Sequence, residues 1–254
     1  MKYPYALQLY SVRDKFQMDV AGALQGVKAA GFDRVELAGT YGLTPDRLRR
    51  VLDSAGIQAV SMHVPYAELV GNPVAAADMA AAFGLTDAVV PWLGGDMCPD
   101  RAAWVAAARA MDAAGAALRV RGVQLSYHNH AHEFEKLGDE TIFDLIFAHS
   151  DPAHLALQLD TCWSTVGGAD TPALLARYAG RVAQIHVKDC RAWAPGANPV
   201  LTELGRGIMD LSKVLPAAKA AGARWFIVEQ DESETDSMES AAANAAFMAA
   251  CNQE

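Results

Sequence analysis

Eight short segments rich in apolar and β-branched residues recur along the chain, and a segment with helical spacing follows each of them. The eight segments are 5–12, 34–38, 58–64, 87–93, 123–130, 155–163, 182–189 and 225–230. Their starts lie 24 to 43 residues apart, which leaves room for a strand, a crossover helix and two short loops. Eight such units in 254 residues predict an α/β protein whose only domain, residues 1–254, is a (β/α)8 TIM barrel.

A doubly wound open sheet is the alternative that this pattern leaves. Such a sheet normally carries a glycine-rich phosphate-binding turn after its first strand, whereas the segment from Tyr10 to Lys15 contains no glycine. No internal linker or low-complexity tract divides the chain. The longest connection contains the insertion from Arg191 to Gly207, and a loop of this length in a compact domain is usually functional.

Charge and composition narrow the class of protein. The chain has 21 Lys and Arg against 30 Asp and Glu, a net charge of −9, and 52% of its residues are hydrophobic. The apolar content supports a folded core, and the acidic balance weighs against nucleic acid as a partner. No apolar run approaches the roughly 18 residues of a membrane helix, and the chain does not start like a signal peptide. We therefore expect a cytoplasmic protein with no membrane partner.

The four cysteines lie far apart in the sequence and form no C-x-x-C pair. This spacing gives no support to a disulfide framework or to a zinc site built from cysteines. Any metal site in this chain would then have to use other side chains.

Ionisable side chains interrupt the apolar character at the ends of six predicted strands. They are Glu36, His63, His128 with His130, Asp160, His186 with Lys188, and Glu229. In a parallel barrel these strand ends meet at one face, where the active site lies. Because each buried charge costs several kcal/mol unless it is paired or bound to a cation, the pattern predicts a shared site at this face.

Oxygen and imidazole donors within this set suit a divalent metal ion. Asp160, His186 and Glu229 would supply three of them, and Glu133, just after the fifth strand, a fourth. Mn²⁺, Mg²⁺, Co²⁺ and Zn²⁺ all remain open. His186 alone would suit a hydrogen-bonded core histidine, but its place between two carboxylate-bearing strands favours ligation. Lys188 points to the same face and either holds a substrate oxygen or neutralises Glu229 or Asp160.

Other side chains of this face are candidates for binding a substrate. We expect His128 and His130 in the site, whereas His132 could point into solvent. His63 should reach the same pocket, with a place in the core as the alternative. Glu36 could hydrogen-bond substrate hydroxyls or a lysine.

Aromatic and basic residues add further candidates. Trp163, like Trp92 and Trp193, could stack on the apolar face of a sugar ring, although plain loop packing explains each of them equally well. Arg206, within the glycine-rich segment 203–207, could fold over the site and donate to an anionic or polyhydroxyl ligand.

Four sequence pieces together resemble one known family. They are Tyr127-His128-Asn129-His130 with Glu133-Phe134, Leu159-Asp160 with Trp163, Ile185-His186-Val187-Lys188-Asp189, and Val228-Glu229. The chain resembles, over essentially its whole length, the xylose-isomerase-like TIM barrels. That superfamily of sugar phosphate isomerases and epimerases also holds inosose dehydratase, hydroxypyruvate isomerase, ketose 3-epimerases and endonuclease IV.

The resemblance implies a ligand set as well as a fold. Epimerases of this superfamily hold one divalent metal ion with Glu, Asp, His and Glu from strands five to eight. Asp160, His186 and Glu229 match the last three. The strand-five glutamate is replaced by His128, so that the fourth ligand is either Glu133 or His128. Histidine-rich versions of this strand resemble the inosose dehydratase branch.

The activity implied is isomerisation or epimerisation of a ketose or keto-sugar through an enediolate, with the metal ion as Lewis acid. Glu229 or Glu133 would remove the proton next to the carbonyl, and His63, His128 or Lys188 would shuttle protons to oxygen. Substrate contacts would come from Glu36, His63, His130, Trp163 and Arg206.

Three rivals accompany this expectation. Loss of a β-hydroxide from the same enediolate would make the protein a dehydratase of a keto-sugar or keto-inositol. A zinc-dependent nuclease of the endonuclease IV type is opposed by the net charge of −9, and a non-catalytic sugar-binding barrel by the metal-like set of side chains. The expected partner is a small carbohydrate, and a homo-oligomer is left open.

Overall fold

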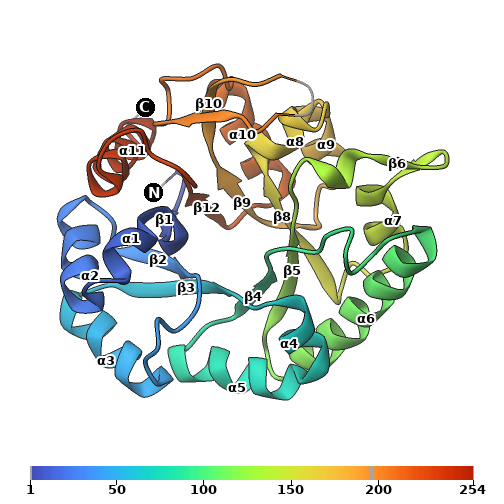
Figure 1. Ribbon diagram of the computed structural model, residues 1–254, viewed down its shortest axis with the longest axis horizontal. Helices are drawn as coiled ribbons and strands as arrows, with labels where there is room; N and C mark the ends of the chain where they lie inside the picture. Colours follow the sequence, from blue (N-terminus) through green and yellow to red (C-terminus); the bar gives the residue numbers. More distant parts are fainter. Residues whose placement is uncertain (1, 195–196, 254) are drawn as a thin grey trace.

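A closed barrel of eight parallel strands forms the centre of the computed structural model, which describes residues 2–194 and 197–253. The strands follow the order β1-β2-β3-β4-β5-β8-β9-β12 around the barrel, and β12 closes on β1 (Figure 1). Their bounds are β1 Tyr5–Gln8, β2 Arg34–Leu37, β3 Gln58–His63, β4 Asp87–Val90, β5 Gln124–His128, β8 Leu155–Asp160, β9 Val182–Val187 and β12 Trp225–Val228. The predicted (β/α)8 barrel is therefore confirmed, and the open sheet is excluded.

Helices surround the barrel and cover the outer faces of its strands (Figure 1). The longer ones are α2 Val20–Ala29, α3 Pro45–Ala55, α5 Pro73–Phe83, α6 Arg101–Val120, α7 Ile142–Ala148, α9 Thr171–Arg177, α10 Leu211–Ala221 and α11 Ser237–Cys251. Short helices in the loops are η1 Leu9–Val12, α1 Arg13–Phe16, α4 Tyr66–Gly71, η2 His132–Phe134 and α8 Thr161–Val166. Within the described residues, no helix is long and apolar enough to span a membrane.

Sequence signals at the helix ends behave as their chemistry requires. Helix α3 starts with Pro45 after Thr44, whose hydroxyl accepts a hydrogen bond from the Arg47 amide, and it stops at Gly56 in the left-handed conformation (φ 65°). A side-chain cap and a proline at the first position satisfy or remove the amides left free at a helix start, and glycine adopts positive φ without steric cost. These local signals fix where the outer layer turns back toward the barrel.

All eight predicted strands end earlier than expected, and three of them end three or four residues early. The first stops at Gln8 and continues as η1, the fourth stops at Val90, and the sixth stops at Asp160. The Asp160 carboxylate accepts the Trp163 amide at 2.8 Å and thereby caps α8. A polar residue at a strand end starts a new helix here, which a reading based on apolar runs does not detect.

Two hairpins project from the loops at the carboxyl ends of the strands. One pairs β6 Lys136–Leu137 with β7 Glu140–Thr141, and the other pairs β10 Asp189–Ala192 with β11 Val200–Thr202. The second hairpin occupies the predicted insertion from Arg191 to Gly207, of which Pro195 and Gly196 lie outside the described residues.

Packing between α6 and the start of β8 predicts an unusual response to alanine. A Cβ on Gly115 would meet the backbone carbonyl oxygen of His154 well inside van der Waals contact. Alanine normally favours a helix interior by about 1 kcal/mol, but this clash should make Gly115→Ala destabilising by about 1–3 kcal/mol. Thermal unfolding measures the effect, with an expected fall of the midpoint by roughly 2–4 °C per kcal/mol.

Gly71→Ala is the matched control, because nothing lies within 4 Å of a Cβ at that helical position. Its midpoint should stay at or slightly above that of the wild type. A stabilised Gly115→Ala protein would contradict this account of the packing.

Candidate active site

Four side chains from consecutive strands of the barrel converge at the carboxyl end. His128 ends β5, Asp160 ends β8, His186 lies in β9, and Glu229 follows β12 directly. Each offers one ligand atom, these atoms all lie within 4.8 Å of one another, and all four residues are buried. The register explains the convergence, since Asp160 lies directly opposite His186, and His186 directly opposite Ile227, two residues before Glu229.

The free donor atoms of this cluster fit a divalent cation. Asp160 Oδ2 and His128 Nδ1 are buried and make no hydrogen bond. Buried polar atoms in folded proteins almost always have a hydrogen-bond partner. Asp160 Oδ2 is in ion-pair contact with Lys188 and lies 3.9 Å from His128 Nε2, so both residues keep donor capacity that a cation could use. Burial holds the pKa of His128 well below 6.5, which leaves its imidazole neutral and able to donate a lone pair. Two imidazoles and two carboxylates form a donor set typical of transition-metal and zinc sites.

His186 lies between two carboxylates. Its Nδ1 is 2.7 Å from Glu229 Oε2, and its Nε2 is 2.7 Å from Glu36 Oε2. Burial alone would lower the pKa of His186, but Glu229 and Glu36 raise it to about 10. Without a cation, this imidazole is therefore protonated on both nitrogens. Its positive charge then lies between the two carboxylates.

Lys188 is enclosed by three carboxylates. Its Nζ lies 2.7 Å from Glu229 Oε2 and 2.9 Å from Asp231 Oδ2. It also lies 3.0 Å from Asp160 Oδ2, in ion-pair contact but without hydrogen-bond geometry. Although burial opposes its charge, these carboxylates keep the pKa of Lys188 well above its usual value. Of the two roles left open by the sequence, neutralising the carboxylates is the one that its contacts match.

Glu36 lies at the centre of a polar network inside the barrel. Its side chain is fully buried and accepts hydrogen bonds from Gln8 (2.7 Å), Ser61 (2.6 Å) and Gln158 (2.7 Å), and His63 Nε2 lies 3.0 Å away. Burial would raise its pKa, yet His63 and His186 hold that pKa well below 4.5. Glu36 is thus placed beneath the site, in contact with protein groups on all sides, rather than on the wall where we expected it to meet a substrate.

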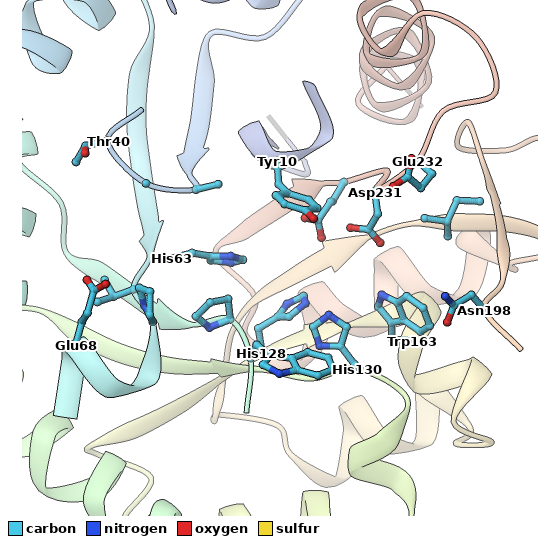
Figure 2. A pocket seen from close by; sticks show the side chains of 18 of the residues that line it. Tyr10, Thr40, His63, Glu68, His128, His130, Trp163, Asn198, Asp231 and Glu232 are labelled. Atoms are coloured by element: carbon cyan, nitrogen blue, oxygen red, sulfur yellow. The ribbon is translucent and has the colours of Figure 1, made fainter. Parts of the chain in front are cut away.

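A pocket of about 720 Å³ opens above the cluster (Figure 2). His63, His128, His130, Trp163 and Glu229 line it, as the sequence led us to expect. Figure 2 shows the histidines in the middle of the pocket, with Thr40 and Glu68 on one side and Trp163 and Asn198 on the other. Trp92 also contributes to the wall, whereas Trp193 is not among the lining residues.

Several lining residues were missed by the sequence reading. They are Tyr10, Thr40, Glu68, Asn198, Asp231 and Glu232. Asp231 follows Glu229 by two residues, a spacing that could have revealed it. Tyr10 and Glu68 lie in the short helices η1 and α4, and Thr40, Asn198 and Glu232 lie in connecting segments. Apolar periodicity carries no signal at such positions.

Glu133 does not join the four-residue cluster. It is fully buried, accepts the Tyr127 hydroxyl at 2.6 Å and the His130 amide at 2.8 Å, and lies 3.3 Å from His132. Burial raises its pKa. These contacts turn its carboxylate toward the loop after β5, so the strand-five position of the cluster is occupied by His128.

Arg206 lies away from the pocket. Its side chain is 66% exposed and pairs with Glu203 at 3.4 Å. The pocket wall contains other residues of the same connection, Asn198, Pro199 and Leu201. The connection between β9 and α10 therefore contributes to the pocket as predicted, but through these residues and not through Arg206.

Comparisons with known proteins agree with the barrel fold. A family model described as "Xylose isomerase-like TIM barrel" matches residues 24–251. An inosose dehydratase of Lacticaseibacillus casei is 25% identical over 244 residues, which cover 83% of this chain and 81% of that protein.

Solved structures share the fold. A sugar phosphate isomerase/epimerase from Parabacteroides distasonis ATCC 8503 superposes with a TM-score of 0.84 at 19% identity, covering 97% of this chain and 98% of that one. The structure of an IOLI protein with a bound zinc atom gives a TM-score of 0.77 at 12% identity, covering 97% of both chains.

The cluster predicts which variants lose metal. His128→Ala should lower the affinity for Zn²⁺ by at least about tenfold, because a donor is removed, whereas Glu133→Gln should change it less. Chelator competition at fixed pH measures both affinities, and circular dichroism checks that both variants are folded. A larger loss in Glu133→Gln than in His128→Ala would contradict the assignment of the strand-five position.

Metal-free protein should lose stability as the pH rises from about 6.5 to about 10. Because the pKa of His186 is about 10 in the folded chain and 6.5 when unfolded, its stabilising charge is complete below pH 6.5 and lost above pH 10. Urea unfolding with a chelator present, for wild type and His186→Gln, measures the difference. That difference should shrink across this range, and a constant difference would contradict the charged state assigned to His186.

Proposed function

Because the chain belongs to the xylose isomerase-like TIM barrel family, we propose that it is a divalent-metal-dependent isomerase or epimerase of a small ketose or keto-sugar. The observation that carries this proposal is the cluster of His128, Asp160, His186 and Glu229 beneath the pocket. It supplies neutral and anionic donors below a space lined by aromatic and polar groups. Such a floor suits a substrate with a carbonyl and neighbouring hydroxyls.

We assign the metal ion to these four residues. Their nitrogen and oxygen donors suit Zn²⁺, Mn²⁺ or Co²⁺, with Mg²⁺ less favoured because it seldom binds imidazole. The bound ion would polarise the substrate carbonyl as a Lewis acid. His186 would lose a proton to solvent when one of its nitrogens binds the ion. The positive charge of the ion would then replace that of the protonated His186 beside Asp160 and Glu229.

The chain itself offers two groups on the pocket wall that could accept a proton from the substrate. Glu229 lies on the pocket wall, and although burial would raise its pKa, Lys188 and His186 keep it ionised. His130 lines the same wall, and burial holds its pKa well below 6.5, so that it is a neutral base. We propose that Glu229 removes the proton next to the carbonyl and that His130 or His63 moves protons between oxygens.

Other predicted catalytic residues receive supporting roles in this proposal. Glu133 accepts the backbone amide of His130 and so fixes the start of the loop that carries this histidine. Lys188 holds the carboxylates of Asp160 and Glu229 in place by its charge. His128 serves as a metal ligand.

The pocket suits a polyhydroxylated ring. Tyr10, Trp92 and Trp163 offer aromatic faces, and Asn198 and Asp231 offer hydrogen-bonding groups. The carboxylates of Glu68, Asp231 and Glu232 along the wall would repel a phosphate backbone, which disfavours the nuclease alternative. The cytoplasmic location and a homo-oligomeric state remain predictions.

Dehydration of a keto-sugar or keto-inositol is a second candidate, and two observations favour it. The L. casei relative is named an inosose dehydratase, and His128 stands in the cluster where a second glutamate would serve epimerisation. Elimination needs one base for the carbon-bound proton and one acid for the departing hydroxide, which leaves as water. Glu229 and a histidine of the pocket could fill these roles.

Proton exchange tests the proposal. The Mn²⁺-loaded protein is incubated in D₂O with a panel of ketoses and 2-keto-myo-inositol, and products are followed by NMR. Deuterium next to the carbonyl in recovered or isomerised sugar is the expected result, whereas an unsaturated ketone would select dehydration. No exchange with any panel member by fully metal-loaded protein would contradict the proposal.

Glu229→Gln should lower the exchange rate by about 10²-fold or more, because the base is lost. Glu135→Gln is the matched control, since Glu135 is an exposed loop residue outside the pocket wall. Full exchange in Glu229→Gln would remove Glu229 from the role of base.

A further inference from the structure

We infer that Asp189 is a positioning residue that holds the β10–β11 hairpin in place as a preformed wall of the pocket. The inference rests on the proposed function only in taking this pocket as the substrate site. Asp189 begins β10 immediately after Lys188. It therefore joins the strand that carries His186 to the segment that carries Asn198, Pro199 and Leu201 into the pocket.

The Asp189 carboxylate is buried and accepts four backbone amides. Oδ1 accepts from Cys190 (2.9 Å) and Met209 (3.0 Å), and Oδ2 accepts from Gly205 (2.9 Å) and Gly207 (3.0 Å). Three of these amides belong to the segment that returns from β11. The side chain thus ties the two ends of the hairpin segment together.

These bonds explain why a carboxylate is tolerated at this buried position. Asp189 is 1% exposed, and in the described part of the chain it forms no ion pair. Several amide donors can compensate for the loss of water around a buried carboxylate. The cost of burial is offset only while residues 205–209 keep their present path, so the carboxylate selects that path.

Glycine at position 207 is required by the same contact. A Cβ there would collide with Asp189 Oδ1 and with the carbonyl oxygen of Cys190. Gly205 has φ +77°, a conformation that side chains rarely adopt. The Gly205-Arg206-Gly207 sequence is therefore the part of the loop that closes around Asp189.

A second anchor fixes the segment on its other side. The Leu204 amide donates to Asn244 Oδ1 at 2.7 Å, and the Ser240 hydroxyl donates to Glu203 Oε1 at 2.9 Å. Both partners lie on α11. The segment after β11 is therefore fixed at two places, by Asp189 after β9 and by α11. This double attachment holds the hairpin as a fixed wall of the pocket.

Asp189→Asn and Asp189→Ala test the inference, with Asp210→Asn as the matched control. Asp210 is an exposed carboxylate just after the same segment, and its partners among the described residues are Ser212 and Lys213. Gly207→Ala disturbs the contact from the other side. Metal-loaded proteins are compared by amide hydrogen exchange of residues 200–209, by metal content, and by KM and kcat for the sugar that shows deuterium exchange.

The expected result has three parts. Exchange of residues 200–209 speeds up by about tenfold or more in the Asp189 and Gly207 variants, as the loss of about 1.4 kcal/mol or more would give. KM rises by a similar factor while kcat stays within about threefold, because the wall and not the cluster is disturbed. Metal content is unchanged, and Asp210→Asn behaves as the wild type.

Other outcomes overturn the inference. Unchanged exchange in Asp189→Asn and Asp189→Ala would show that the carboxylate does not fix the segment. Faster exchange with an unchanged KM would show that the segment is no functional wall, and loss of metal would reduce Asp189 to a structural role. If no panel sugar is turned over, the proposed function fails without deciding the role of Asp189. The affinity for 2-keto-myo-inositol, measured by calorimetry, then replaces KM. Unchanged affinity in the Asp189 and Gly207 variants would overturn the inference that the hairpin is a wall of the pocket.

Discussion

Charge compensation at the carboxyl end of the barrel is the constraint on which the rest of the site depends. The parallel strands bury the carboxylates of Glu36, Asp160 and Glu229 close together, and Asp231 lies at their edge. Such carboxylates persist only when cations or donors meet them. In this chain Lys188 and a protonated His186 provide that balance. Asp160 Oδ2, which pairs with Lys188 by charge alone, and His128 Nδ1 make no hydrogen bond.

Apolar periodicity predicted the barrel because its parallel strands are largely buried and a segment with helical spacing follows each of them. It also predicted that Asp160, His186 and Glu229 would meet, since the ends of parallel strands share one edge. It could not place Glu36, whose partners Gln8, Ser61 and Gln158 are polar residues hidden inside other strands. Pairings of this kind depend on the closure of the barrel and on its register, neither of which a single sequence displays.

The choice between Glu133 and His128 shows the same limit at one residue. Both lie near the end of β5, and spacing alone allowed either to complete the cluster. The Tyr127 hydroxyl, from β5, and the His130 amide, from the loop after β5, both donate hydrogen bonds to Glu133. These hydrogen bonds keep the Glu133 carboxylate out of the cluster, although a carboxylate is the expected ligand at this position. Arg206 was misplaced for a related reason, because the path of its loop is set by Asp189 and not by its own side chain.

Asp160 divides its two oxygens between different tasks. Oδ1 caps α8 through the amide of Trp163, and Oδ2 faces the cluster. A glutamate would lengthen the reach and lose the cap, and an asparagine would change the charge. The position is therefore closed to variation, whereas Thr40, Glu68 and Asn198 on the outer wall have no such double duty. Adaptation of this barrel to a new sugar would therefore proceed by substitutions in the outer wall, while Asp160 at the end of β8 stays unchanged.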